Sequence, residues 1–282
     1  MIESKIVTQK GSVAVYSTES SGRPQLYCIH GGMGLSSDSL MPWLLPLATI
    51  FDLVFIDQRG CGKSTPAKDS SYLFSDFAGD ILEVVRKTRS NDIIGIFGHS
   101  MGGMIAVETL ALFPDIFQFA ILSNSAIDAS WRSDGGNDLS SFKTDAMIDA
   151  VKLYASDPSN RRLRDLAIAY GPLYFPELAE NDARTEMAKF TYRGDAMSFM
   201  NENCFPGMDL RNQAESIHIP TLIFSGEADL VVPPHCSVAI AESVPQSVHI
   251  AIEGAGHFPF ITQPNKFFKQ VSQWWEETRR KS

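Results

Sequence analysis

Short runs of apolar residues rich in valine, isoleucine and phenylalanine recur along the chain, and longer segments of mixed polarity separate them. Such runs predict β-strands at residues 12–16, 25–29, 53–56, 93–97, 119–122, 221–224 and 248–252. The segments between them, such as residues 74–89, are typical of helices. This alternation predicts an α/β fold class, in which helices cover both faces of a mostly parallel sheet.

The alternation lapses between about residue 125 and residue 214, where the pattern becomes helical, polar and rich in aromatic residues. A strand pattern returns only at residue 221. A stretch of this length without strands predicts a helical insertion above the sheet. We therefore predict a core domain of residues 1–125 and 215–282, with a helical cap of residues 126–214.

The charge of the chain argues against nucleic acid as a partner. Its 282 residues carry a formal net charge of −9, and its densest basic cluster is the short segment 279–281. Such a surface cannot neutralise a run of phosphates. The first residues lack the apolar core of a signal peptide, and no run of about 18 apolar residues follows. We expect a soluble, cytoplasmic protein with no membrane partner.

The four cysteines lie far apart, without a Cys-x-x-Cys pair, and we expect them to be small buried hydrophobic residues. The chain has no His-Glu-x-x-His motif. The sequence GCGKS at residues 60–64 resembles a phosphate-binding loop but lacks the first glycine at the required spacing. We therefore expect neither a metal ion nor any other cofactor.

Residues 98–102 read Gly-His-Ser-Met-Gly and fit the pattern Gly-x-Ser-x-Gly. The motif follows a predicted buried strand and precedes a predicted helix at residues 105–113. In a sharp strand-to-helix turn, glycines two residues before and after a serine relieve crowding while its hydroxyl is pushed out of the sheet edge. Ser100 is therefore the candidate nucleophile.

A serine hydroxyl is a weak nucleophile near neutral pH, so Ser100 needs a histidine base and a carboxylate to orient that base. Among six histidines, His257 lies in a glycine-rich loop directly after a predicted strand, at the same sheet edge as Ser100. Asp229 follows the strand before it, beyond a turn at residue 226, and is the favoured acid. Asp128 is the reserve candidate, and Glu227 is better explained as a solvated turn residue.

The chain order Ser100, Asp229, His257 is similar to that of the α/β-hydrolase superfamily, and the resemblance extends over essentially the full length. It implies that the His-Gly-Gly turn after the strand at 25–29 supplies a backbone N–H to an oxyanion, here from Gly32. Met101 would give the second N–H. The chemistry implied is acyl transfer through an acyl-enzyme on Ser100.

Residues 57–66, Asp-Gln-Arg-Gly-Cys-Gly-Lys-Ser-Thr-Pro, resemble the corresponding stretch of proline iminopeptidases and the related tricorn-associated aminopeptidases. In that family an acidic cap residue receives the free α-amine of the peptide. The match in this chain is Glu202, within Met-Asn-Glu-Asn-Cys-Phe. A carboxylate there would pair with an ammonium and restrict cleavage to the chain terminus. The resemblance therefore implies a peptidase that releases proline or another apolar N-terminal residue.

Other activities remain open on the same residues. The segment Gly-His-Ser-Met-Gly-Gly is also frequent among esterases, lactonases and carbon–carbon bond hydrolases of this fold. Cap aromatics predict an apolar portion in the substrate, whether a small molecule or a short peptide. A third interpretation is a ligand-binding protein on a hydrolase scaffold, which the complete set of candidate catalytic residues disfavours.

Overall fold

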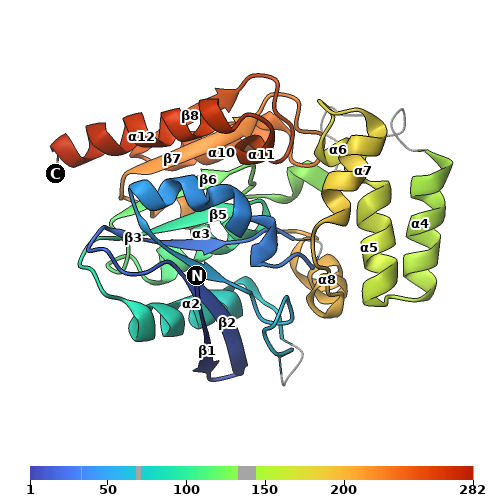
Figure 1. Cartoon of the computed structure of the whole chain (residues 1–282), viewed down its shortest axis with the longest axis horizontal. Helices are drawn as coiled ribbons and strands as arrows, with labels where there is room; N and C mark the ends of the chain where they lie inside the picture. The colour runs from blue at the N-terminus through green and yellow to red at the C-terminus, as the bar shows by residue number, and fades with distance from the viewer. Residues whose placement is uncertain (33, 68–70, 133–143, 282) are drawn as a thin grey trace.

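The computed structural model describes residues 1–32, 34–67, 71–132 and 144–281. Eight strands in these residues form one sheet in the order β1-β2-β4-β3-β5-β6-β7-β8 (Figure 1). β2 pairs antiparallel with both β1 and β4, whereas all neighbouring pairs from β4 to β8 are parallel. The strands are β1 (Ile2–Thr8), β2 (Gly11–Ser17), β3 (Gln25–Ile29), β4 (Asp52–Ile56), β5 (Ile94–His99), β6 (Phe119–Ser123), β7 (Thr221–Gly226) and β8 (Ser247–Ile252).

All seven predicted strands are present, and their ends differ from the prediction by at most two residues. The strand that the pattern missed, β1, lies at the edge of the sheet, and most of its side chains are exposed. An edge strand of this kind does not need the apolar run by which a central strand is recognised. The predicted mostly parallel sheet of an α/β fold is confirmed.

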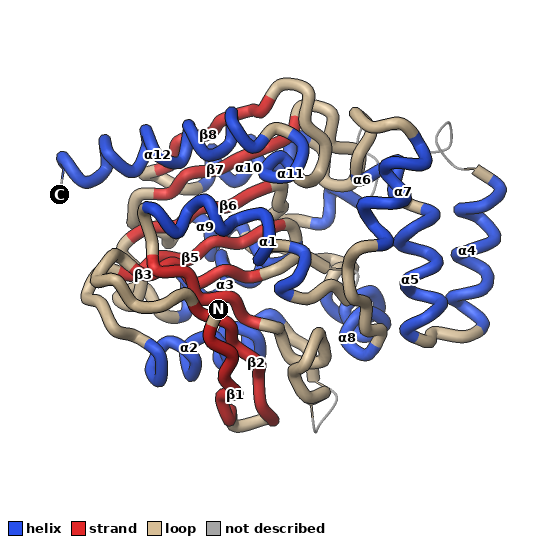
Figure 2. The backbone as a smooth tube through the Cα atoms, viewed as in Figure 1, coloured by secondary structure: helices blue, strands red, loops and turns tan. Residues whose placement is uncertain are grey.

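Helices cover both faces of this sheet, as Figure 2 shows for α12 (Pro264–Lys281) on one side and α2 (Phe74–Thr88) on the other. α2 and α3 (Met101–Leu112) contribute to one hydrophobic cluster, and α1 (Met41–Leu44) and α12 contribute to the other. Successive side chains of a strand point to opposite faces, so Tyr27 enters the first cluster and Cys28 the second. This two-sided burial explains why the central strands are almost wholly apolar.

The strand register brings the candidate residues together at the carboxyl ends of the parallel strands. Gly98 in β5 lies opposite Ile29 in β3, and the last residue of β5 lies opposite Ser123 in β6. At the same level, Gly226 in β7 pairs with Ile252 in β8. The segments that follow these strands therefore emerge side by side at their carboxyl ends, where parallel α/β sheets place ligand sites.

Between β6 and β7 the described residues form short helices that gather beyond one end of the sheet (Figure 1). They are α4 (Asp145–Ser156), α5 (Asn160–Ala169), α6 (Gly171–Tyr174), α7 (Glu180–Ala188) and α8 (Asp195–Phe199), followed by a single π-helical turn (Met200–Cys204). A further helix, α9 (Arg211–Glu215), packs against α3 instead, and its residue Ala214 belongs to the hydrophobic cluster to which α3 contributes. We refer to α4 through the π turn as the cap.

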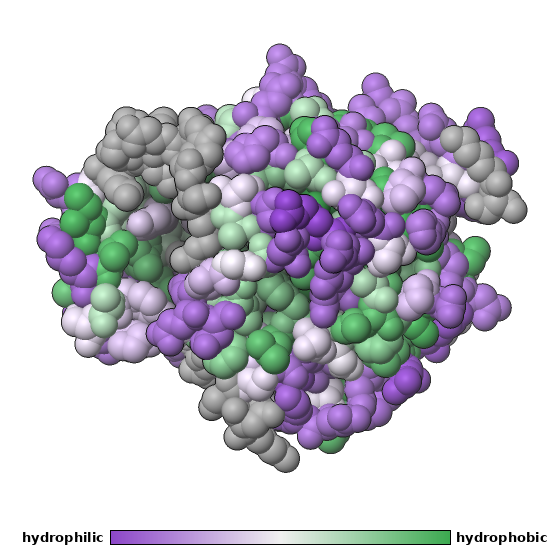
Figure 3. All heavy atoms as spheres, turned by 180° about the vertical axis from the view of Figure 1, so that it is seen from behind, coloured by the Kyte–Doolittle hydropathy of each residue, from purple (hydrophilic) through white to green (hydrophobic). Residues whose placement is uncertain are grey.

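The surface carries hydrophilic residues with hydrophobic residues scattered among them, as the rear face in Figure 3 shows.

Cys28, Cys61, Cys204 and Cys236 are buried and free of disulfides, as small hydrophobic residues would be. Of the helices described, none has both the length and the apolar composition needed to cross a bilayer. α10 (Pro234–Ser243) and α11 (Pro259–Thr262) complete the layers.

Candidate active site

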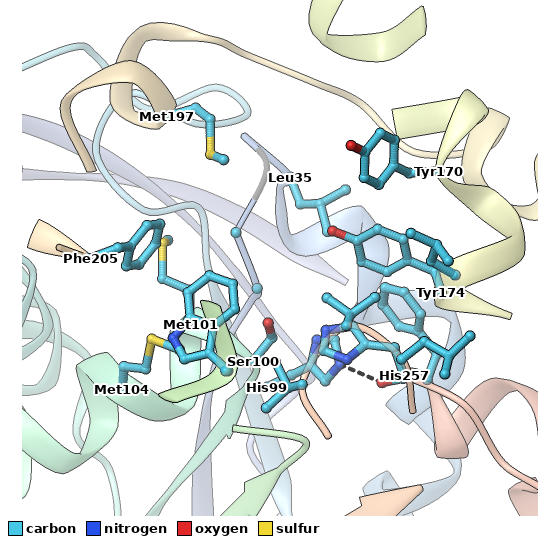
Figure 4. A pocket seen from close by; sticks show the side chains of 18 of the residues that line it. Leu35, His99, Ser100, Met101, Met104, Tyr170, Tyr174, Met197, Phe205 and His257 are labelled. Atoms are coloured by element: carbon cyan, nitrogen blue, oxygen red, sulfur yellow. Dashed lines mark hydrogen bonds between the residues drawn. The ribbon is translucent and has the colours of Figure 1, made fainter. Parts of the chain in front are cut away.

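Ser100 occupies the tight turn that joins β5 to α3. Its backbone adopts φ 54° and ψ −124°, a left-handed conformation that serine rarely adopts. The two sides of this turn approach each other so closely that a Cβ on Gly98 would lie 2.5 Å from the carbonyl oxygen of Gly102. Position 98 therefore requires glycine. The Ser100 side chain, half-buried, lines a cavity above the sheet edge (Figure 4). The sequence motif thus forms the strained turn predicted for it.

The ring of His257, in the loop after β8, meets the carboxylate of Asp229, in the loop after β7. The Nδ1 atom of His257 lies 2.8 Å from Oδ2 of Asp229, and both side chains are buried. Because a carboxylate oxygen accepts hydrogen bonds, Nδ1 carries the hydrogen of this pair. The other ring nitrogen, Nε2, takes no part in this bond, and Ser100 and His257 both line the cavity (Figure 4).

The Asp229 carboxylate has a full set of hydrogen-bond donors. Its Oδ1 atom accepts the backbone N–H groups of Val231 at 2.9 Å and Val232 at 3.0 Å. Its Oδ2 atom accepts the side-chain N–H of Asn124 at 2.8 Å, beside the bond to His257. These donors fix the carboxylate plane relative to the imidazole ring.

Asn124 is a member of this group that the sequence pattern did not reveal. It follows β6, is fully buried and has a left-handed backbone with φ 52°. Its side-chain nitrogen also donates to the carbonyl oxygen of Gly256 at 3.2 Å, and its oxygen accepts from the Ser123 hydroxyl at 2.9 Å. The available signal was an asparagine, the residue that best tolerates this conformation after glycine, directly after a buried strand.

His99 contacts His257 through both the backbone and the ring of that residue. Its Nε2 atom lies 2.8 Å from the carbonyl oxygen of His257, and the two ring centroids are 4.8 Å apart. Burial lowers the pKa of His99 well below its usual range, and the neighbouring His257 ring acts in the same direction. His99 is therefore a neutral packing residue, and Tyr174 closes the other side of the His257 ring at a centroid distance of 5.2 Å.

The loop after β3 lies against the Ser100 turn. A Cβ on Gly32 would be 3.4 Å from the Cβ of Met101, and one on Gly31 would be 3.2 Å from the Cβ of Ser100. His30 holds the loop from within, because its Nδ1 bonds the Gly31 carbonyl at 2.9 Å and its Nε2 accepts a backbone N–H at 3.1 Å. Burial lowers the pKa of His30, which keeps it neutral. Gly32 and Met101, the predicted oxyanion donors, are thus adjacent.

A cavity of about 520 Å³ lies between the sheet edge and the cap. Its walls are mainly apolar and aromatic, and no lining residue among those described is an acid, a lysine or an arginine. Burial raises the pKa of its Tyr174 hydroxyl, so this group stays neutral too. The lining comprises Gly31, Gly32, Leu35, His99, Ser100, Met101, Met104, Trp131, Tyr170, Leu173, Tyr174, Met197, Asn201, Phe205, Leu230, Val231, Val232, His257 and Phe258.

Glu202, the candidate amine-binding residue, lies apart from this group. It is exposed on the π turn after α8 and is not among the lining residues, whereas its neighbour Asn201 is. The alternative acids also lie elsewhere: Glu227 is exposed, and Asp128 accepts the backbone N–H of Ser130 at 2.9 Å. Of the candidate acids, Asp229 is the one that contacts His257.

The aminopeptidase-like stretch at residues 57–66 makes structural contacts. The buried Asp57 carboxylate accepts the backbone N–H groups of Ser37 and Lys63, each at 2.9 Å, and the hydroxyl groups of Ser37 and Tyr16. The buried Arg59 donates to Asp80 at 2.7 Å. These contacts hold the loop after β4 in place, and this structural role explains the residue types in the stretch.

Comparisons with known proteins agree with this architecture. The family described as alpha/beta hydrolase fold matches residues 24–264. A proline iminopeptidase from Saccharolobus solfataricus is 26% identical over 276 residues, covering 92% of this chain and 87% of that protein. An alpha/beta fold family hydrolase from Bacillus anthracis str. Sterne has a TM-score of 0.79 at 20% identity, covering 97% of this chain and 99% of its own. The esterase RhEst1 from Rhodococcus sp. has a TM-score of 0.77 at 20% identity, covering 99% and 100%.

The family match spans most of the chain, including the Ser100 turn and the loops that carry Asp229 and His257. The order of the strands and the similarity to a solved hydrolase over nearly the whole chain agree with that fold. This chain belongs to the α/β-hydrolase fold family and is a hydrolase.

Proposed function

We propose that the protein is a serine ester hydrolase with the catalytic triad Ser100, His257 and Asp229. His257 Nε2 takes the hydroxyl proton as Ser100 Oγ attacks the substrate carbonyl, and Asp229 stabilises the imidazolium that forms. The carbon–oxygen bond to the alcohol then breaks, and His257 returns the proton to the leaving oxygen. Water attacks the Ser100 ester by the same route and releases the acid.

The backbone N–H groups of Gly32 and Met101 hold the oxyanion in this proposal. Met101 is the first residue of α3, where an N–H group has no partner within the helix. The positive end of the helix dipole also points there. Preorganised donors of this kind typically lower the barrier by about 3–4 kcal/mol each.

The observation that carries the ester assignment is the absence of charged side chains among the described residues that line the cavity. A peptide substrate with a free N-terminus would bring its ammonium group into this apolar space. Without a carboxylate partner among the described lining residues, its desolvation would cost on the order of several kcal/mol. A neutral ester or lactone carries no such penalty, so the cavity favours it.

The position of the base orients the substrate. Because His257 must protonate the leaving oxygen, the alcohol portion lies on its side of the cavity, where Tyr174 is located. The acyl portion then lies against the opposite wall, where Met104 and Phe205 are located (Figure 4). Trp131 and Phe205 pack edge to face at 5.4 Å. Thioether and aromatic groups of this kind suit a flexible aliphatic or aryl acyl group.

An aminopeptidase of the proline iminopeptidase type is the second candidate. The relative from Saccharolobus solfataricus and the stretch at residues 57–66 favour it. Its two sequence arguments are the motif match at Glu202 and the stretch at residues 57–66. The exposed position of Glu202 weakens the first, and the structural contacts of Asp57 weaken the second. The two candidates share the same triad and differ in whether the substrate must carry a free amine.

Turnover on matched substrates separates them. Wild type and Ser100→Ala would be assayed on p-nitrophenyl esters of increasing acyl length, on lactones, and on prolyl and alanyl arylamides with free and acetylated amines. The control is Ser272→Ala, a serine of α12 whose hydroxyl bonds the Phe268 carbonyl. We expect ester turnover by wild type and the control, and a loss of about 10⁴-fold or more in Ser100→Ala.

Cleavage of free-amine arylamides that acetylation abolishes, without ester turnover, would replace the ester assignment by the aminopeptidase. Ester turnover by Ser100→Ala at the wild-type rate would remove the triad itself. Binding without turnover of any substrate by wild type would indicate a ligand-binding protein.

A further inference from the structure

The loop that carries His257 is held by the core through its carbonyl groups. The carbonyl oxygen of Gly256 accepts the side chain of Asn124 at 3.2 Å, and that of His257 is bonded to His99 at 2.8 Å. Both partners are fully buried residues of the sheet edge. The core therefore fixes one side of this loop.

The N–H groups of the same two residues are held by the cap. The His257 N–H donates to the carbonyl oxygen of Tyr174 at 2.9 Å. The Gly256 N–H donates to the side-chain oxygen Oε1 of Glu177 at 2.8 Å. Both acceptors lie at the connection between α6 and α7, so the backbone of the base is clamped between core and cap.

The contact between cap and loop is close. A Cβ on Gly256 would lie 2.5 Å from Cδ of Pro176 and 2.7 Å from Oε2 of Glu177. Glycine at this position lets the Glu177 carboxylate reach the backbone N–H directly. A side chain there would push the cap connection away from the loop.

Glu177 carries a cost that stability alone does not explain. Its second oxygen, Oε2, is buried and has no hydrogen-bond partner within the described part of the chain. A buried oxygen without a partner lowers the stability of the fold by about 1–3 kcal/mol. An apolar residue or a glutamine with a second partner would avoid this loss, which points to a role for the acceptor at Gly256.

We propose that Glu177 is a positioning residue for the catalytic base, a cap carboxylate that fixes the backbone of residues 256 and 257 and thereby the direction of His257 Nε2. The inference rests on the proposed function, in which His257 is the base. Glu177 does not line the cavity, so it acts on the chemical step rather than on substrate binding. Small displacements of a catalytic group are sufficient to slow a reaction by one to two orders of magnitude.

The test compares Glu177→Ala and Glu177→Gln with the control Glu180→Gln, an exposed glutamate of α7 that pairs with Arg184. Active sites are titrated with a fluorophosphonate, and kcat is expressed per titrated site. We expect Glu177→Ala to lower kcat about tenfold with KM within twofold of wild type. Glu177→Gln keeps an acceptor for the Gly256 N–H and recovers kcat to within about threefold, and the control is unchanged.

Wild-type kcat per titrated site in Glu177→Ala would overturn the inference, as would an equal loss in Glu177→Gln. If Glu177→Ala does not fold, Gly256→Ala decides the question: a tenfold lower kcat at unchanged KM supports the clamp, and wild-type kcat overturns it. Ser100→Ala is measured in the same series. Its retention of turnover would refute the proposed function, whereas its inactivity beside a fully active Glu177→Ala would refute the positioning role alone.

Discussion

Replacement of Asn124 by glycine removes the side chain that links the triad acid to the base loop. Two donor bonds disappear, one to the Asp229 carboxylate at 2.8 Å and one to the Gly256 carbonyl at 3.2 Å. A bond to a charged group contributes about 1.5–3 kcal/mol and a neutral bond about 0.5–1.5 kcal/mol. The bond that Asn124 accepts from the Ser123 hydroxyl at 2.9 Å is lost as well, so we expect Asn124→Gly to lose about 2.5–6 kcal/mol of unfolding free energy.

The catalytic loss follows from the same bond. Asp229 must stay aligned with His257 as the ring becomes an imidazolium, and Asn124 bonds the same carboxylate oxygen as the ring does. If the charged bond is expressed in the transition state, its loss corresponds to a decrease in kcat of about tenfold to a hundredfold. The assay is ester turnover per fluorophosphonate-titrated site, with urea unfolding for stability.

Asn124→Ala separates the side chain from the backbone. At φ 52° alanine is strained where glycine is not, so Asn124→Ala should be less stable than Asn124→Gly by about 1 kcal/mol. Both variants lack the same hydrogen bonds and should share one kcat. A kcat for Asn124→Gly within twofold of wild type would refute the reasoning, and unequal kcat values would assign the effect to backbone strain.

Two further measurements test the buried histidines and the acyl wall. Burial lowers the pKa of both His30 and His99, so each is neutral in the fold and takes up a proton on unfolding below about pH 6.5. Stability should then fall as the pH decreases below that value, by at most about 1.4 kcal/mol per pH unit for each residue; melting temperatures that stay flat from pH 8 to pH 5 would contradict this. Met104→Trp fills the acyl side of the cavity and should lower kcat/KM for p-nitrophenyl decanoate about 10–200-fold while sparing the acetate. Equal losses on both esters would place the acyl group elsewhere.

The sheet could be predicted from sequence because burial on both faces leaves a local record in each central strand. The same logic identified the loops after β5, β7 and β8, since parallel strands end at one edge. Ser100, Asp229 and His257 could therefore be selected before any contact was known. β1 left no such record, because an exposed edge strand has no apolar run.

Contacts between distant segments could not be predicted in this way. Asn124 bonds a residue 105 positions away, and Glu177 bonds one 79 positions away. Neither asparagine nor glutamate is unusual at the end of a strand or before a helix, so the fold alone reveals the partners. The expectation for Glu202 came from a motif match, which does not fix the direction of a side chain. In the structure Glu202 is exposed on a π turn, and its neighbour Asn201 lines the cavity.

The hydrogen bonds from residues 256 and 257 to the cap limit how this scaffold can be recombined. A chimera that exchanged the cap for that of another hydrolase would change the substrate cavity and, with it, the two acceptors at Tyr174 and Glu177. A cap graft designed by matching helix lengths alone would supply a new binding surface but would leave the backbone of residues 256 and 257 less firmly held. Donor caps should instead be chosen by whether they present a carbonyl and a carboxylate or amide at the same two places, so specificity and rate can be transplanted together.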